Sequence, residues 1–166
     1  MGADDGREPV EFERFCEREY VRLVRFLSVY CGELATAEDL AQETLARVFQ
    51  HWERVRGMDR PELWARRVAL NLGNSWHRRR RNPPSAGWGS ESGDDETERV
   101  DSDREFARLV ASLSPRQRAV VVLRFYEDLS VADTAELMGV RAGTVRALSS
   151  QALDRLRATV TAEGPA

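Results

Sequence analysis

Apolar residues recur at helical spacing along most of this chain, and runs that alternate apolar and polar positions, as β-strands do, are few. One apolar face runs through residues 10–31, a second through residues 36–52, and a third from Asp59-Arg60-Pro61 to Arg81. Further helical segments follow from about residue 104 onward. The pattern therefore predicts an all-α fold.

Capping residues indicate where several of these helices begin. Thr36 has Asp39 three residues later, Asp59 precedes Pro61, and Ser114 precedes Pro115-Arg116-Gln117. The second helix should bury Leu40 or Ala41, Leu45, Val48 and Trp52. The third helix should bury Leu63, Trp64, Val68 and Leu72. The helix that opens the C-terminal part should bury Phe106, Leu109, Val110 and Leu113.

A polar stripe follows the outer face of the second helix, where the core needs no polar side chain. It consists of Asp39, Gln42, Glu43 and Ala46, spaced at i, i+3, i+4 and i+7. Taken alone, such a stripe is either a plain solvated face or a surface for a partner.

Residues 130–157, SVADTAELMGVRAGTVRALSSQALDRLR, indicate two short helices joined by a tight turn, the pattern of a helix-turn-helix. A Ser130–Asp133 capping box should start the first helix, Gly139 should end it, and the second should begin near Ala142. The outer face of the second helix is left to Thr144, Arg146, Ser150 and Gln151, whose side chains suit the major groove. An ordinary helical hairpin with a solvated face is the alternative.

Charge is unevenly distributed, although the net charge is only −3. Residues 60–81 hold seven arginines and one acid, whereas residues 91–105 hold eight acids and two arginines. The stretch after Pro84 is small, acidic and poor in aliphatic residues, a composition that cannot bury enough surface to fold alone. The sequence therefore predicts two small helical domains, residues 1–81 and 104–166, joined by a flexible acidic linker, residues 82–103.

Other classes of site find little support. Cys16 and Cys31 lie in one apolar-periodic helix and are expected to be buried and reduced. The two histidines, His51 and His77, are far apart in sequence, and no metal-ligand spacing, phosphate loop or nucleophile-base pair is evident. We expect a cytoplasmic, nucleoid-associated protein that is not an enzyme and has neither metal nor cofactor.

Three segments, taken in order, resemble the extracytoplasmic-function (ECF) sigma factors of bacterial RNA polymerase. AEDLAQETLARVFQHW is similar to their core-polymerase-binding helix, ELWARRVALNLGNSWHRRRR to their promoter −10 helix, and LSPRQRAVVVLRFYEDLSVADTAELMGVRAGTVRALSSQALDRLR to their −35-binding domain. The resemblance is greatest to the actinobacterial SigE-type group, and it covers about three quarters of the chain.

The resemblance implies specific partners and residues. Asp39, Gln42 and Glu43 would dock on the clamp helices of the β′ subunit. The expected protein partner is therefore core RNA polymerase, contacted through its β′ and β subunits. The −10 element would be bound by Asn71, Asn74, His77, Arg78, Arg79, Arg80 and Arg81. The −35 element would be bound by Arg141, Thr144, Arg146, Ser150 and Gln151.

The resemblance also bears on promoter opening and on specificity. It places the pocket for a flipped −10 base in the loop from Val55 to Pro61, and it runs the acidic linker through the polymerase cleft. Trp64 and Trp76 are aromatic and capable of stacking on bases, although Trp64 lies on the apolar side. Ala147 and Leu148 depart from the usual family pattern, so the −35 preference is expected to be altered.

The function implied is promoter recognition, −10 melting and transcription initiation with core RNA polymerase, and an anti-sigma factor would be a further partner. A stand-alone helix-turn-helix regulator would explain the C-terminal part but leave the Asp39 stripe and the acidic linker without a role. An anti-sigma antagonist would need no arginine run.

Overall fold

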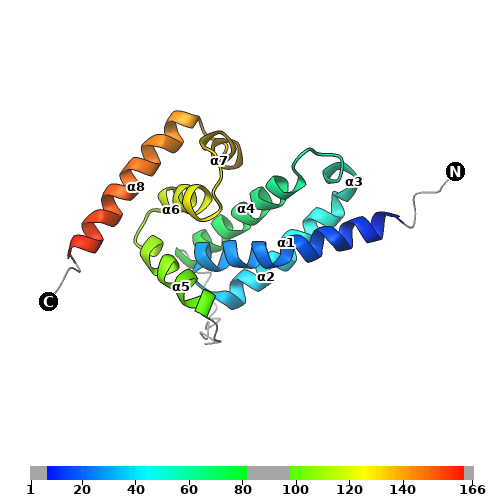
Figure 1. Cartoon of the computed structure of the whole chain (residues 1–166), viewed down its shortest axis with the longest axis horizontal. Coiled ribbons are helices and arrows are strands. Elements are labelled where there is room, and N and C mark those ends of the chain that lie inside the picture. The colour runs from blue at the N-terminus through cyan, green and yellow to red at the C-terminus, as the bar shows by residue number, and fades with distance from the viewer. Residues whose placement is uncertain (1–6, 82–97, 163–166) are drawn as a thin grey trace.

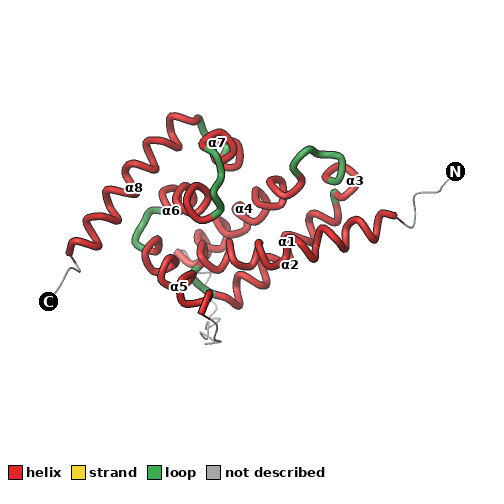
Figure 2. The backbone as a smooth tube through the Cα atoms, viewed as in Figure 1, coloured by secondary structure: helices red, strands yellow, loops and turns green. Residues whose placement is uncertain are grey.

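The computed structural model describes residues 7–81 and 98–162, and every regular element in these ranges is helical, as predicted (Figures 1 and 2). The elements are α1 (Arg7–Cys31), α2 (Leu34–Gln50), α3 (Trp52–Val55), α4 (Pro61–Arg81), α5 (Glu98–Ala111), α6 (Pro115–Val121), the π-helical turn η1 (Val122–Tyr126), α7 (Val131–Met138) and α8 (Ala142–Ala162). We call residues 7–81 the N-terminal module and residues 98–162 the C-terminal module.

In the N-terminal module, α1 packs against α2 and α4. Leu23, Phe26 and Leu27 of α1 are fully buried in the main apolar cluster, and Ala41 rather than Leu40 is the fully buried alternative on α2. A second cluster at the far end of the module joins α1, α2, α3 and α4 through Phe15, Val48, Trp52, Val55 and Ala65.

Two predicted helix starts are wrong by one or two residues. α2 begins at Leu34, so Thr36 lies inside its first turn, where its hydroxyl donates to the Glu33 carboxylate instead of capping the helix. α4 begins at Pro61, which makes Arg60 and not Asp59 the residue before the helix. Proline suits this first position because it has no N–H group to leave unpaired.

The buried face of α4 is rotated from the predicted one. Leu72 is buried as expected, but Leu63, Trp64 and Val68 are only half-buried. Small residues occupy the closest contacts instead, and a Cβ added at Gly73 would lie 2.8 Å from the Tyr30 ring of α1. Close approach of α1 and α4 therefore depends on residues too small to register in an apolar pattern.

The helix-turn-helix forms as predicted. The Ser130 hydroxyl accepts from the backbone N–H of Asp133, Gly139 ends α7 in the left-handed conformation at φ 64°, and α8 starts at Ala142. Val120, Ala135 and Val145 form a small buried cluster between α6, α7 and α8. The capping box is incomplete, however, because the Asp133 carboxylate bonds to Arg60 of the N-terminal module at 2.8 Å.

The helices before the helix-turn-helix pack mainly as expected. Val110 and Leu113 are buried, and Phe106 and Leu109 are half-buried against the core. Ser114 and Gln117 form a complete capping box at the start of α6.

The two modules share one apolar core. A single cluster joins Leu70 of α4 and Leu27 of α1 to Val110 of α5 and Leu123 of η1, and α1 packs against α5. Helix α5 begins at Glu98, inside the range predicted as linker, and residues 82–97 lie outside the described residues. The modules are thus docked against each other in this structure.

Cys16 and Cys31 are free and only partly exposed. Burial raises the pKa of the Cys31 thiol to about 12, so this thiol stays protonated and unreactive. In the described part of the chain, no helix combines the length and the apolar character needed to span a membrane.

Candidate nucleic-acid interface

The polar stripe of α2 is exposed along its whole length. Asp39, Gln42, Glu43 and Ala46 all face solvent, and Glu43 pairs with Arg47 of the same helix at 2.9 Å. Phe49 follows three residues after Ala46 and is 61% exposed, in contact with the ring of Phe12. An exposed aromatic side chain beside a polar stripe is typical of a partner surface. Helical spacing from Asp39 was a signal that could have added Phe49 to the predicted set.

The C-terminal end of α4 carries the arginine run. Arg78, Arg79, Arg80 and Arg81 are all exposed, so the predicted basic surface exists. Arg80 lies 3.6 Å from the Glu33 carboxylate, and its guanidinium stacks on the Trp76 ring at 4.8 Å from the centroid. Among the described residues, Arg79 has no such partner.

The other three predicted −10 residues are placed unequally. Asn71 is exposed, whereas the side-chain oxygen of Asn74 accepts a hydrogen bond from the Tyr30 hydroxyl at 2.5 Å. His77 points inward, with a ring nitrogen 2.9 Å from the Tyr30 carbonyl oxygen and 3.0 Å from the Arg118 guanidinium. Burial, followed by the charges of Arg118, Arg81 and Arg80, lowers the pKa of His77. In this arrangement His77 joins the two modules and is turned away from solvent.

The loop between α3 and α4 also contacts the C-terminal module. Val55 is fully buried at its start, and Arg60 near its end holds Asp133 of α7. The loop predicted to flip a base is therefore held against the first helix of the helix-turn-helix.

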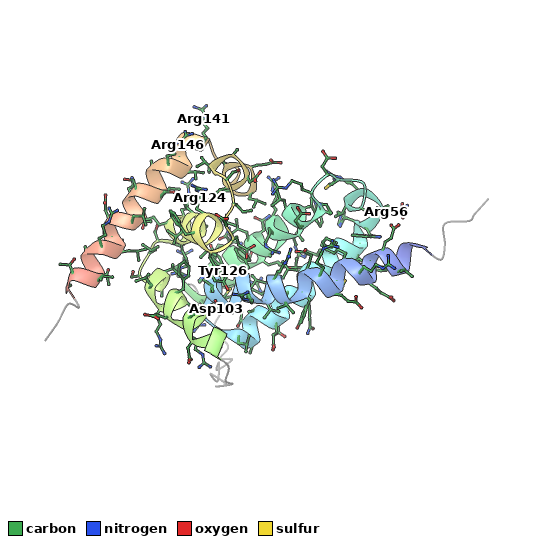
Figure 3. All side chains as sticks on the ribbon, in the orientation of Figure 1. Arg56, Asp103, Arg124, Tyr126, Arg141 and Arg146 are labelled. Atoms are coloured by element: carbon green, nitrogen blue, oxygen red, sulfur yellow. The ribbon has the colours of Figure 1, made fainter. Side chains whose placement is uncertain are left out.

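The predicted −35 residues lie around the N-terminal half of α8. Arg141 projects from the tip of the molecule and Arg146 lies near it on α8 (Figure 3); Arg146, Ser150 and Gln151 are exposed, and Thr144 is half-buried. Of the two atypical positions, Ala147 is exposed and Leu148 packs on the small cluster of the helix-turn-helix. The surface is available to a groove, and Ala147 leaves a gap in its polar contacts.

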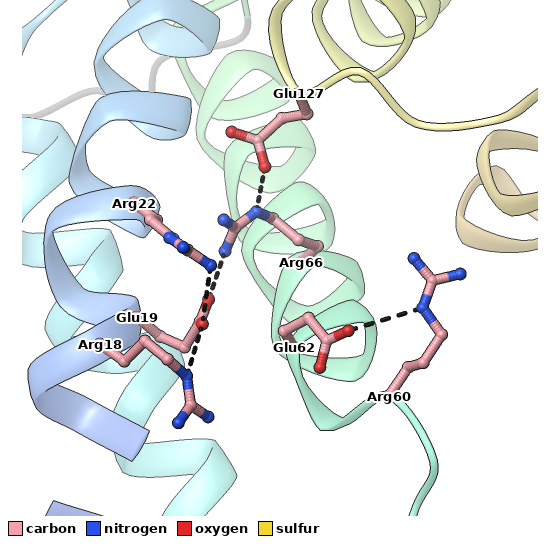
Figure 4. A network of polar contacts seen from close by, with 7 residues as sticks. All are labelled: Arg18, Glu19, Arg22, Arg60, Glu62, Arg66 and Glu127. Carbon is pink, nitrogen blue, oxygen red and sulfur yellow. Dashed lines mark hydrogen bonds and ion pairs between the residues drawn. The ribbon is translucent and has the colours of Figure 1, made fainter. Parts of the chain in front are cut away.

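Ion pairs fasten the modules to each other. Arg66 of α4 is only 6% exposed and lies between Glu19 of α1, at 3.4 Å, and Glu127 after η1, at 2.5 Å (Figure 4). Arg25 of α1 lies 3.3 Å from Asp103 of α5. Arg66 and Glu19 belong to the same module, so separation of the modules would remove only Glu127 from this buried arginine.

Comparison with known proteins identifies the chain's family. Residues 15–82 match sigma-70 region 2, and residues 109–158 match sigma-70 region 4. The RNA polymerase sigma-E factor of Streptomyces coelicolor is 32% identical over 157 residues, which cover 93% of this chain and 89% of that protein. The chain belongs to the ECF RNA polymerase sigma factors. The ECF sigma factor SigL of Mycobacterium tuberculosis is 34% identical over 83% of this sigma factor and 82% of its own length.

Solved structures support the fold of this sigma factor. RpoE of Bartonella quintana, solved with the anti-sigma factor NepR, has a TM-score of 0.75 at 21% identity and covers 91% of this chain and 97% of its own. CnrH, solved with the cytosolic domain of CnrY, has a TM-score of 0.69 at 18% identity and covers 92% and 89%. The expected resemblance to ECF sigma factors is therefore confirmed, and proteins of this family act in transcription initiation by binding core RNA polymerase and promoter DNA.

Proposed function

We propose that this sigma factor docks on the β′ clamp helices of core polymerase through Asp39, Gln42 and Glu43, with Phe49 as an apolar anchor. The observation that carries the proposal is the exposure of the entire stripe on a helix whose other face is buried. Acidic and amide groups give orientation and register to an interface, and a nearby aromatic residue gives most of its affinity.

Promoter DNA would then be held at two sites. The exposed arginines at the end of α4 supply a positive field for the −10 element, and its melting would expose bases to the α3–α4 loop. Arg141, Thr144, Arg146, Ser150 and Gln151 of α8 would contact the −35 element in the major groove.

Promoter engagement would require the modules to separate. Asn71, Asn74, Arg78 and Arg81 line a cleft whose opposite wall is formed by α6 and α7. Melted −10 DNA that bound this face of α4 would compete for space with the helix-turn-helix. The docked form is therefore a resting form, and an anti-sigma factor that prefers it would keep the protein inactive in the cytoplasm.

In vitro transcription with purified core polymerase tests the docking surface. The double variant Asp39→Ala/Gln42→Ala should lose core binding and promoter-dependent transcription while keeping the wild-type circular dichroism and Tm, because neither side chain is buried. Glu17→Ala, an exposed acid on α1, is the matched control and should behave as wild type.

Two results would overturn the proposal. Normal core affinity of the double variant would show that the stripe is not the docking face. Specific binding of promoter duplex by the free chain, unchanged by core polymerase, would favour the stand-alone regulator.

A further inference from the structure

A cleft of about 250 Å³ lies between the two modules, where α4 faces α6 and α7. Its polar rim consists of Asn71, Asn74, Arg78 and Arg81 from α4 and Arg116 from α6, and none of the described residues that line it is acidic. Positive side chains of both modules therefore converge on one space.

The arginines of this cleft lack the carboxylate partners that the other arginines between the modules have among the described residues. Arg60, Arg66 and Arg25 each meet a carboxylate of the opposite module. Among the described residues, by contrast, Arg81 and Arg116 form neither an ion pair nor a side-chain hydrogen bond, and Arg78 bonds only to the Ser75 hydroxyl at 3.2 Å. Like charges brought together by docking repel each other, and an anion between them turns that repulsion into attraction.

The side-chain amide of Asn74 also offers a hydrogen-bond donor for an anion in this cleft. Its oxygen accepts the hydrogen bond from the Tyr30 hydroxyl, and its NH₂ group donates to none of the described residues. The cleft thus presents guanidinium and amide donors together, the groups that bind phosphate oxygens most strongly.

The floor of the cleft is apolar. Leu70 of α4, Ala119 of α6, and Leu137 and Met138 of α7 line it. An apolar floor beneath a cationic rim suits a ligand with a flat ring and a charged tail.

We propose that this cleft binds a nucleoside di- or triphosphate, with the phosphates bridging α4 and Arg116 and the ring resting on the apolar floor. The site exists only when the modules are docked, so the ligand stabilises the docked form by mass action. Its regulatory effect rests on the proposed function, because the same face of α4 is the proposed −10 surface. A nucleotide bound here withholds that face from promoter DNA.

Binding is tested on the free full-length chain by isothermal titration calorimetry with ADP, pyrophosphate and adenosine as separate probes. ADP should bind saturably, one to one, and raise the Tm, pyrophosphate should bind more weakly, and adenosine weakest. Arg116→Ala should weaken ADP binding about tenfold or more, since a charge-assisted contact is lost. Arg155→Ala removes an equal charge from an exposed site on α8 and should change nothing.

A second arm separates a free nucleotide from the phosphates of DNA. Arg116 belongs to neither proposed DNA surface, so Arg116→Ala holoenzyme should bind a −10 single strand with wild-type affinity. Equal losses for ADP and DNA would assign the cleft to DNA and overturn the proposal, as would absence of saturable ADP binding, equal affinity for adenosine, or equal effects of the Arg116 and Arg155 variants. The ADP titration needs neither polymerase nor promoter, so its failure is independent of the proposed function.

Discussion

Arg146 and Arg79 are both exposed, yet their positions predict different losses of DNA binding. Arg146 lies on the face of α8 that would enter the major groove, so Arg146→Ala should cost about 1–3 kcal/mol on the preferred −35 sequence and relax preference at one or two positions. Arg79→Ala should weaken binding to all sequences and reduce the salt dependence, because it removes only a phosphate contact. Fluorescence anisotropy of holoenzyme on matched and mismatched promoters measures both, and equal, sequence-independent losses would contradict the assignment.

His77 makes the docked arrangement sensitive to pH. Burial and the neighbouring charges of Arg118, Arg81 and Arg80 lower its pKa from the ordinary 6.5, so the unfolded chain binds the proton more readily. The stability linked to neutral His77 is therefore fully present above pH 6.5. It is lost as the pH falls from 6.5 through the lower pKa of the folded state. Tm measured from pH 5 to 8 should decline less steeply on the acid side for His77→Gln than for wild type. Parallel Tm profiles would show that His77 does not titrate between the two states.

Site residues were predictable from the sequence where their positions depend on local helical spacing, and were not where they depend on residues distant in sequence. The stripe from Asp39 to Ala46 follows from helical spacing alone. The inward position of His77 does not, because its partners Tyr30 and Arg118 lie 47 and 41 residues away in the chain. Asp133 is likewise the right residue type to complete a local capping box, but its carboxylate binds the guanidinium of Arg60, which is distant in sequence.

The close packing of helices α1 and α4 depends on Gly73, which has no side chain to meet the Tyr30 ring. Gly73→Ala would place a Cβ 2.8 and 2.9 Å from two carbons of the Tyr30 ring. The strain should lower the free energy of unfolding by about 1–3 kcal/mol, despite the better helix propensity of alanine. Gly143→Ala in α8 is the control, because nothing lies near its added Cβ, and it should stabilise the protein by up to about 1 kcal/mol. Urea denaturation distinguishes them, and a stabilising Gly73→Ala would show that the helices separate without cost.

Helix ends that carry clear caps were predicted well, as at Ser114, Ser130 and Gly139. The π-helical turn η1 was not predicted, because a one-residue widening leaves no mark on an apolar pattern. In η1 the backbone N–H of Glu127 bonds to the Val122 carbonyl at 2.9 Å, five residues back. This turn immediately precedes the carboxylate that reaches Arg66.

At the scale of the whole molecule, the ion pairs between modules should govern how often they separate. Glu127→Gln combined with Asp133→Asn removes one carboxylate charge from each of two contacts between the modules, and the charge-assisted bond of the buried Arg66–Glu127 pair contributes about 1.5–3 kcal/mol. The double variant should have a larger radius of gyration by small-angle X-ray scattering, and 0.5 M salt should enlarge wild type in the same direction, a concentration at which the Debye length is roughly 4 Å. Asp154→Asn breaks a pair within α8 and is the control. An unchanged radius in the double variant would show that the apolar core alone holds the modules.

The docking of the modules could not be predicted from the sequence. Each module has its own helical pattern, and the acidic stretch between them indicated independence. The modules are joined by contacts such as Arg25–Asp103, which are separated by 78 residues in sequence. They are also joined by half-buried residues, which the apolar pattern of a single helix places equally well on its buried or its exposed face.

The shared apolar core also bears on the lifetime of the protein in the cell. Separation of the modules uncovers Val110 and Leu113 of one and Leu70 of the other, all buried in the docked form. Apolar surface of this kind invites aggregation and proteolysis unless a partner covers it. An open chain that finds no polymerase would therefore be degraded sooner than a docked one, and its abundance would follow the supply of free polymerase.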